Sequence, residues 1–249
     1  MRMMLLQLLV FALAVQAAPP RGPNQVHMPS FGHIDQGAKR ESALDAATNI
    51  KKLVHQVTTG TLSSVFPASA DDPPQLDQGV TITYHDENGD EFIPYKPKME
   101  GRPFALPEYH APCHSAPSLT FLILPISRSS QNILQHPHHY ATYTLAEELK
   151  KGETSMSSAR VALMGNVTLL RDLSEEEETD LAECYLSYHP DARGWLPGKK
   201  GSPHFSEWAR MDLEKIYYVG GFGDTHYIGD VPVGLYKAVS RDEKFSAWS

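Results

Sequence analysis

Apolar residues recur along the chain with two different periods, and each period predicts a different kind of element. Between residues 42 and 56, Leu44, Ala47 and Val54 recur at helical spacing while a lysine pair occupies the opposite face. A capping box begins at Ser42, directly before this segment. We therefore predict an amphipathic helix that ends before Gly60.

A second helix is predicted to begin at Ser174, where a run of glutamates completes another capping box and suits the helix N-terminus electrostatically. Leu181, Cys184 and Tyr185 form its apolar face, which indicates that the cysteine points inward, and Pro190 ends the helix. A short third helix is predicted near residues 129–136, with Ser129 as its cap.

The remaining apolar segments alternate with polar residues or run continuously over a few positions, which is typical of strands. Asn88-Gly89 predicts a hairpin between two of them, and Gly165 predicts a bulge within a long one. The predicted strands are 60–66, 80–84, 91–93, 101–105, 119–126, 140–145, 160–170, 208–211 and 215–219. Strands dominate, so the predicted fold is mainly β with appended helices (α+β), organised as a barrel.

A glycine-rich stretch, Gly220-Gly221-Phe222-Gly223, follows the last predicted strand. Its third glycine is misplaced for a dinucleotide-binding loop, and residues 227–228 continue with β-formers rather than a helix. We interpret the stretch as a sharply bent strand or turn that shapes the end of the barrel, or at most as the rim of a pocket.

The N-terminus predicts a secretory signal peptide over residues 1–17. An apolar run from Met3 to Val15 is too short to span a bilayer, which needs about 20 helical residues. Small residues ending at Ala17 are typical of a cleavage site. Residues 18–37 are interpreted as a flexible leader and 241–249 as a tail without a retention signal. We expect the secretory pathway, with an extracellular or vacuolar/lysosomal destination and no membrane span.

The charge pattern argues against nucleic-acid binding. The formal net charge is -8, and lysine and arginine do not cluster. Two residue pairs matter in an oxidising compartment: Cys113 and Cys184 either form one disulfide or stay buried as thiols, and Asn166 heads an N-glycosylation sequon with Thr168.

The sequence contains no nucleophile elbow, Walker loop or paired Cys-x-x-Cys motif, so no catalytic residue is predicted. Histidines at 136, 138 and 139 are interrupted by Pro137, and we interpret them as surface loop residues. His110 and His114 have helical zinc spacing, but a proline lies between them. We therefore predict no metal site.

Several longer stretches together resemble the CREG family of secreted glycoproteins and their fungal relatives, within the FMN-binding split barrels. The stretches are "GTLSSVF", "GRPFA", "LTFLILPISRSSQNILQHP", "ARVALMGNVTLL", "YLSYHPDARGWLPG", "HFSEWARMDLEKIYYVGGFGD" and "YIGDVPVGLY". The resemblance covers residues 38–240, with 67–99 as an insertion. It implies a six-stranded split β-barrel in the fold of pyridoxamine-phosphate oxidase, a homodimer, and a protein that lacks the enzyme activity of its flavin relatives.

The same resemblance bears on flavin binding. In flavin-binding relatives, a Ser-Arg-Lys segment contacts the cofactor phosphate. Here Ser127 and Arg128 match, Ser129 replaces the lysine, and "FALPEY" offers no basic residue where the oxidases carry another. A phosphate dianion needs several cationic or amide donors. We therefore expect no cofactor, although FMN remains possible with these three residues at its phosphate.

Three functions remain open at this level. The first is a secreted, non-catalytic split barrel that acts by binding a partner protein or receptor. The second is an FMN-dependent oxidoreductase of the pyridoxamine-phosphate oxidase-like class. The third is a haem-binding split barrel, for which His204 and His226 are the candidate ligands.

Overall fold

The computed structural model describes residues 40–67, 84–85, 91–92, 99–149, 151–202 and 204–242. The predicted signal peptide, the leader, most of the 67–99 insertion and the last residues of the tail lie outside these described residues. Within the insertion, β2 (Tyr84–His85) and β3 (Glu91–Phe92) pair antiparallel, as expected for the predicted hairpin.

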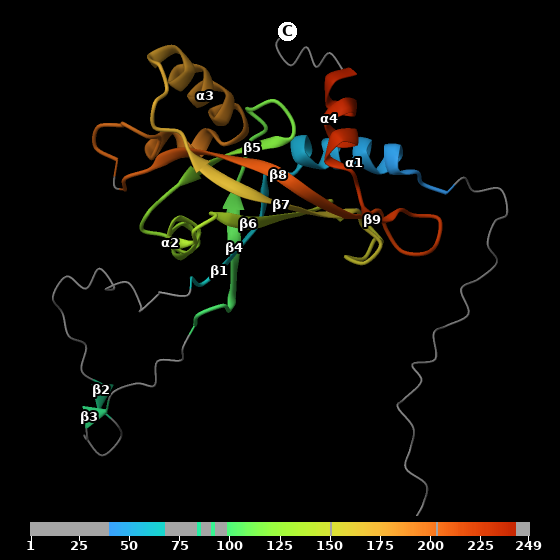
Figure 1. Ribbon diagram of the computed structural model, residues 1–249, viewed down its shortest axis with the longest axis horizontal. Helices are drawn as coiled ribbons and strands as arrows, with labels where there is room; N and C mark the ends of the chain where they lie inside the picture. The colour runs from blue at the N-terminus through green and yellow to red at the C-terminus, as the bar shows by residue number, and fades with distance from the viewer. Residues whose placement is uncertain are drawn as a thin grey trace, which may run out of the picture. The chain divides into compact units, whose positions relative to one another are not determined.

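The main sheet has seven antiparallel strands (Figure 1). They are β1 (Thr59–Val65), β4 (Pro103–Tyr109), β5 (Ser118–Ile123), β6 (Tyr140–Ala146), β7 (Arg160–Leu169), β8 (Glu207–Val219) and β9 (Ile228–Asp230). Their order is β4-β1-β6-β7-β8-β5, with β9 beside β8. An antiparallel bridge between Ala111 and Thr120 links the chain after β4 to β5, so the two ends of the sheet meet. The result is the predicted barrel of six main strands with appended helices.

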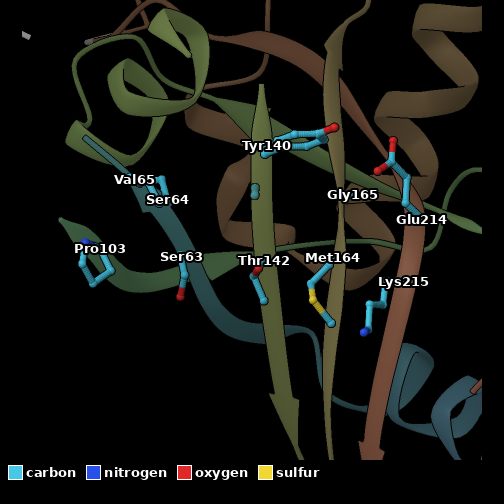
Figure 2. Close-up of a pocket in the computed structure, with 11 residues that line it drawn as sticks. Ser63, Ser64, Val65, Pro103, Tyr140, Thr142, Met164, Gly165, Glu214 and Lys215 are labelled. Atoms are coloured by element: carbon cyan, nitrogen blue, oxygen red, sulfur yellow. The ribbon is translucent and has the colours of Figure 1, made fainter. Parts of the chain in front are cut away.

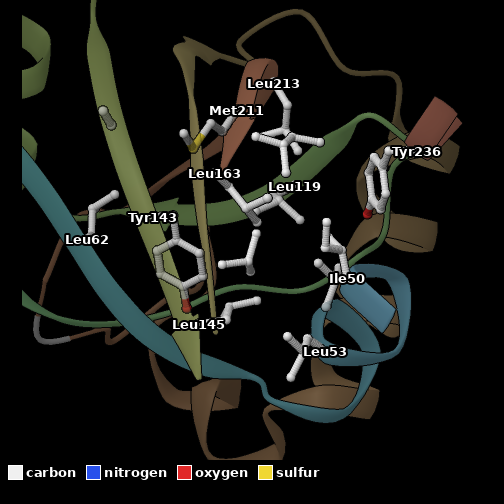
Figure 3. Close-up of a cluster of buried hydrophobic side chains, with 14 of the residues drawn as sticks. Ile50, Leu53, Leu62, Leu119, Tyr143, Leu145, Leu163, Met211, Leu213 and Tyr236 are labelled. Atoms are coloured by element: carbon white, nitrogen blue, oxygen red, sulfur yellow. The ribbon is translucent and has the colours of Figure 1, made fainter. Parts of the chain in front are cut away.

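The inside of the barrel is apolar because side chains alternate along each strand. In β6, for example, Ala141, Tyr143 and Leu145 are buried while their neighbours face outward. Figure 3 shows Tyr143 and Leu145 in one apolar cluster with residues from two helices. Ile50 and Leu53 come from α1 (Ala43–Gln56), and Tyr236 comes from α4 (Val233–Asp242).

The helices cover different parts of the sheet. Helix α1 begins at the predicted capping box of Ser42 and Asp45, and it packs against α4. Helix α2 (Arg128–Gln135) packs against β1 and β4. Helix α3 (Glu175–Tyr188) begins at the predicted capping box of Ser174 and is followed by the 3-10 helix η1 (Pro190–Gly194). No helix in the described part of the chain is both long and apolar enough to cross a membrane.

A second, smaller core lies between α3, η1 and the sheet. Tyr185 of α3 packs edge-on against Trp208 of β8, with ring centroids 5.4 Å apart. Cys113 and Cys184 form a disulfide with their Cα atoms 5.8 Å apart, and this bond ties α3 to the segment that follows β4. The structure thus decides between the two alternatives that the sequence leaves open for these cysteines.

Two sequence predictions were wrong in detail. The segments 208–211 and 215–219 belong to one continuous strand, β8, because the residues between them form a bulge rather than a break. The cap of α2 is Ser127 and not Ser129, because the Ser127 side chain accepts the Ser130 backbone N–H while Ser129 is buried. Helix α4 was not predicted, and it extends past residue 240 to Asp242.

Candidate functional site

A groove of about 450 Å³ lies on the outer face of the sheet, away from the core (Figure 2). Five strands contribute to it, and most of its side chains are uncharged. Its lining residues are Ser63, Ser64, Val65, Pro103, Tyr140, Ala141, Thr142, Met164, Gly165, Glu214 and Lys215. Its volume lies within the range of about 300–1,000 Å³ that is usual for ligand pockets.

One row of cross-strand neighbours forms the floor of the groove. Ser63 of β1 pairs with Thr142 of β6, Thr142 with Met164 of β7, and Met164 with Lys215 of β8. Residues in register point to the same face of a sheet, and Figure 2 shows these side chains side by side. Four segments that are far apart in sequence therefore form one continuous surface.

The adjacent row has the same character. Thr61 pairs with Thr144, Thr144 with Ala162, and Ala162 with Tyr217. Across the two rows, Lys215 is the one charged residue, and its ammonium lies 3.3 Å from the Asp230 carboxylate of β9. We use the name outer face for the surface formed by these two rows and the groove.

A bulge in β8 shapes one side of the groove. Opposite the β7 residues Met164 and Gly165 the register shifts, and Glu214 and Lys215 are both exposed as a result. Gly165 is required here, because a Cβ at this position would lie 1.9 Å from the backbone oxygen of Asp212. The sequence predicts a bulge in the strand that contains this glycine; the register shift does lie at Gly165, but the extra residue, Glu214, belongs to the partner strand β8.

Asn166 of the sequon lies on β7 at the end of this groove. Its register partners are Tyr140 of β6 and Asp212 of β8, and its side-chain amide donates to Glu214 Oε1 at 3.2 Å. Because Val167 points into the core, the neighbouring Asn166 points outward. Tyr140 and Glu214 both line the groove, so the asparagine lies directly beside it.

The segment predicted to contact a phosphate is largely engaged within the fold. Ser127 Oγ accepts the Ser130 N–H at 3.2 Å and lies 2.7 Å from Ser130 Oγ. Ser129 is 3% exposed and is not among the residues that line the groove. Arg128 retains donor capacity, because its buried Nη1 has no hydrogen-bond partner.

The surroundings of Arg128 fit a phosphate poorly. Its guanidinium lies over the Phe66 ring, 5.7 Å from the centroid, and this ring follows the groove residue Val65 in the chain. The buried Oδ1 of Asn132 also lacks a partner, but a carbonyl oxygen repels an anion. The segment thus offers one arginine and the α2 N-terminus but no second cation, which is fewer charged donors than a phosphate dianion usually meets.

A buried polar network around His110, which no sequence pattern predicts, lies in the core of the barrel. His110 is fully buried, with Nε2 3.0 Å from the Val54 carbonyl and Nδ1 3.0 Å from the Tyr143 hydroxyl. Burial lowers the pKa of His110 to about 4. His189 Nε2 lies 2.8 Å from the His110 carbonyl, and burial lowers the pKa of His189 as well. His110 is therefore a neutral core residue and not a ligand.

The glycine-rich stretch begins the loop between β8 and β9 and contacts the start of α1. Glu41 inserts its carboxylate beside Gly220, where a Cβ would lie 2.1 Å from Glu41 Oε2. That oxygen accepts the Tyr227 N–H at 2.8 Å, and the other accepts the Asn49 side-chain amide at 2.8 Å. Burial, followed by the charge of Glu41, raises the pKa of Tyr218. The glycines thus admit a carboxylate of the protein itself, beside a cavity of about 340 Å³.

The two histidines considered as haem ligands are widely separated. His204 precedes β8 and His226 follows it, and a 13-residue strand spans about 40 Å. They cannot bind the same iron. His226 Nδ1 lies 3.8 Å from Glu41, whereas His204 is exposed in the loop before β8. Among the described residues, no three His, Cys, Asp or Glu side chains group closely enough to hold a metal ion.

Residues 41–238 match the family model described as CREG, beta-barrel, which is most of the chain. The chain belongs to the CREG β-barrel family. Membership of this family therefore accounts for the stretches of sequence quoted above and for the barrel of six main strands. No curated protein is significantly similar to this CREG-family chain in sequence.

Solved structures resemble the chain in fold. A haem-binding protein from Mycobacterium smegmatis is 15% identical, with a TM-score of 0.50 over 80% of this chain and 61% of that one. A second structure is 14% identical, with a TM-score of 0.53 over 79% of this chain and 98% of that one. Atu2129 of Agrobacterium tumefaciens, of unknown function, is 13% identical, with a TM-score of 0.47 over 72% and 57%. The chain spans about three fifths of the length of the first and third proteins. At these identities the likeness concerns the fold alone.

Proposed function

We propose that this CREG-family chain is a secreted, non-catalytic glycoprotein that acts by binding a protein partner through the outer face of its sheet. Its first partner is a second copy of the same chain. The observation that carries the proposal is the composition of the two rows in the outer face, which across β1, β6, β7 and β8 have one lysine among Ser, Thr, Ala, Met and Tyr side chains.

Such a surface is unusual for a sheet that faces only water. Antiparallel sheets with one solvated face normally place charged and polar residues on it, whereas the centres of protein interfaces are depleted of charge. Val65, Tyr140 and Tyr217 are 43%, 49% and 41% exposed on this face. Pairing would remove this apolar area from water, at about 25 cal/mol per Å² buried.

A second copy is a suitable occupant because the outer face carries both signs of charge at its edge. In a two-fold interface each face meets itself, so any residue of one copy meets a symmetry-related residue of the other. Glu214 and Lys215 lie side by side at the groove. Two copies can therefore oppose unlike charges around a neutral centre.

The secretory part of the proposal rests on three features. The apolar N-terminal run is typical of a signal peptide, Asn166 heads a sequon, and Cys113 and Cys184 form a disulfide. Disulfides persist in the secretory pathway and are rare in the cytosol. An extracellular or vacuolar destination is consistent with all three.

Light scattering during gel filtration tests the proposal. We expect the sequon-free variant Thr168→Ala to run as a dimer at micromolar concentration, and the same chain carrying Thr142→Arg to run as a folded monomer. Thr142 is half-buried at the centre of the outer face, so an arginine there places two like charges within a paired interface. Thr179→Arg on the exposed surface of α3 is the matched control and should leave the dimer intact. If Thr168→Ala runs as a monomer, or if its dimer survives Thr142→Arg, the proposed surface is refuted.

The runner-up function is an FMN-dependent oxidoreductase. It is favoured by the unpartnered Nη1 of Arg128 at the α2 N-terminus and by the groove that begins next to Phe66. We place it second because Ser127 caps α2 and Ser129 is buried. A yellow protein after purification under native conditions would promote it.

Haem binding is the third candidate. The Mycobacterium smegmatis protein of similar fold is described as haem-binding. In this chain, Met164 and Tyr140 are the side chains at the groove of types that ligate haem iron, and no histidine lies among the described lining residues. A Soret band in the same spectrum would favour this candidate over the other two.

A further inference from the structure

Asn166 occupies an unusual place for a glycosylation site, because it lies on strand β7 at the edge of the outer face and not on a loop. Its register partners Tyr140 and Asp212 flank it on both sides, and its amide donates to Glu214. Tyr140 and Glu214 both line the groove. Any group attached to the Asn166 amide therefore emerges between two residues of the proposed pairing surface.

The sequon is suited to modification before the sheet forms. Glycan transfer acts on the chain as it enters the secretory pathway, where Asn166, Val167 and Thr168 are not yet paired with β6 and β8. Folding then buries Val167 while the asparagine stays half-buried and Thr168 exposed, so the modified side chain keeps its outward direction. The bond to Glu214 is solvent-exposed and uses one of the two amide hydrogens, and a glycosylated amide still retains one.

We propose that a glycan on Asn166 and the pairing of two chains through the outer face exclude one another, so that glycosylation determines which copies can pair. This inference rests on the proposed function, since it concerns the same surface. A glycan is bulky and strongly hydrated. In a two-fold pair, each copy would bring one glycan into the interface. Each glycan would lose its hydrating water against the partner's groove.

The face offers no room for such a group within a closed pair. On the β6 side of Asn166 stands the large Tyr140 side chain, and on the β8 side Arg210 and Asp212 form an ion pair at 2.9 Å. A sugar chain leaving Asn166 is therefore directed away from the sheet, into the space that the partner copy would occupy. By contrast, the inside of the barrel and the helices are untouched, so a glycosylated copy folds normally.

Two substitutions at one position separate the glycan from the side chain. Thr168→Ala removes the sequon but keeps Asn166 and its bond to Glu214, whereas Thr168→Ser changes the same residue and keeps the sequon. The wild-type chain and both variants would be secreted from one eukaryotic host. Intact mass gives the glycan occupancy, and light scattering over a concentration series gives the dimer dissociation constant. Thr142→Arg added to Thr168→Ala assigns any dimer to the outer face.

We expect glycosylated wild type and Thr168→Ser to be monomeric, Thr168→Ala to dimerise, and the dissociation constants to differ by at least about 100-fold, which corresponds to about 2.7 kcal/mol. Glycosylated chains that dimerise as tightly as Thr168→Ala would overturn the inference and leave the pairing surface intact. A secreted wild type without any glycan on Asn166 would overturn it too. If Thr168→Ala is itself monomeric, or if Thr142→Arg does not disrupt its dimer, the proposed function fails together with this inference.

Discussion

The hydroxyl of Tyr143 lies 3.0 Å from Nδ1 of His110 at the centre of the barrel. Because Nε2 faces the Val54 carbonyl at 3.0 Å, this nitrogen carries the proton of the neutral ring and Nδ1 accepts from the hydroxyl. The same hydroxyl lies 2.8 Å from the Glu108 carbonyl, so its single proton serves two acceptors. Protonation of His110 would satisfy every one of these contacts but would place an unneutralised charge in an apolar core.

Stability should therefore fall as the solution becomes mildly acidic. Burial holds the pKa of His110 at about 4 in the folded state, against about 6.5 in the unfolded chain. The unfolded state binds a proton first, so this contribution is fully present above pH 6.5 and is lost as the pH falls toward 4. We expect the unfolding free energy to drop by about 2 kcal/mol between pH 7 and pH 5, measured by urea titration.

The matched variant for this test is His110→Gln. Its amide can donate to the Val54 carbonyl and accept from Tyr143 without titrating. It should be less stable than the wild type at pH 7 but lose less stability by pH 5. Burial also lowers the pKa values of His114 and His189, and these groups leave a smaller residual slope of the same sign. Equal slopes in the two proteins would show that His110 does not titrate in this range.

Loss of the disulfide should destabilise the fold without changing its architecture. Cys113 and Cys184 are 71 residues apart. Closing a loop of that length lowers the conformational entropy of the unfolded chain, which corresponds to a free energy of about 4 kcal/mol at 25 °C. We expect the double variant Cys113→Ser/Cys184→Ser to lose about 2–4 kcal/mol in urea unfolding. The wild type under reducing conditions should lose a similar amount. An unchanged urea midpoint in both proteins would mean that the disulfide does not stabilise the fold.

Gly165 should tolerate no side chain. An alanine Cβ would lie 1.9 Å from the Asp212 oxygen, and backbone on both sides of the bulge prevents its relief. We expect Gly165→Ala to cost about 2–3 kcal/mol, in the upper part of the range for overpacking. Gly194→Ala is the control, because nothing lies within 4 Å of its added Cβ. Similar stabilities for the two variants would contradict the close approach of β7 and β8.

The loop that contains Gly220 and Gly221 should depend on Glu41. The carboxylate accepts the Tyr227 N–H at 2.8 Å, and the Gly220 N–H bonds the Tyr227 carbonyl at 2.9 Å. We expect Glu41→Ala to speed hydrogen exchange at residues 220–227, measured by mass spectrometry, with little change in β6 or β7. Glu108→Ala, which removes a half-buried carboxylate elsewhere in the barrel, is the comparison variant. Equal exchange in the loop for both variants would count against the role given to Glu41.

Much of the fold could be predicted from periodicity because its local signals are strong. The capping boxes at Ser42 and Ser174 mark where α1 and α3 begin, and the alternation in β6 and β7 marks both strands. The error at Ser127 has a local cause as well. Two serines that flank Arg128 are both good caps, and only packing against β1 and β4 shows which one is buried.

No local pattern in the sequence predicts the outer face. Ser63, Thr142, Met164 and Lys215 are unremarkable singly, and only the register of four strands places them in one row. The same holds for Glu41, whose place beside Gly220 brings together residues almost 180 positions apart. The glycines form the predicted bend, but no residue pattern predicts the carboxylate that they admit.

Arg128 gives the sharpest distinction between the proposed function and its flavin alternative. Its guanidinium lies over Phe66 at 5.7 Å, Ser127 caps α2 and Ser129 is buried, so we interpret Arg128 as a packing residue. We expect purified protein to be colourless, and calorimetric titration with FMN to give weak binding or none. We expect Arg128→Ala to leave that titration unchanged while lowering stability by about 0.5–1 kcal/mol, the value of a cation–π contact.

The control for this last prediction is Arg102→Ala, which removes an exposed arginine directly before β4. It should change neither the stability nor the FMN titration. Stability and binding report on different roles of Arg128. A packing role alters unfolding alone, whereas a phosphate contact alters the affinity for FMN, by about a hundredfold for each 2.7 kcal/mol lost. Tight one-to-one binding of FMN that Arg128→Ala abolishes and Arg102→Ala preserves would defeat the non-catalytic proposal. It would also show that the groove beside Phe66 accommodates a flavin in spite of the serine at position 129.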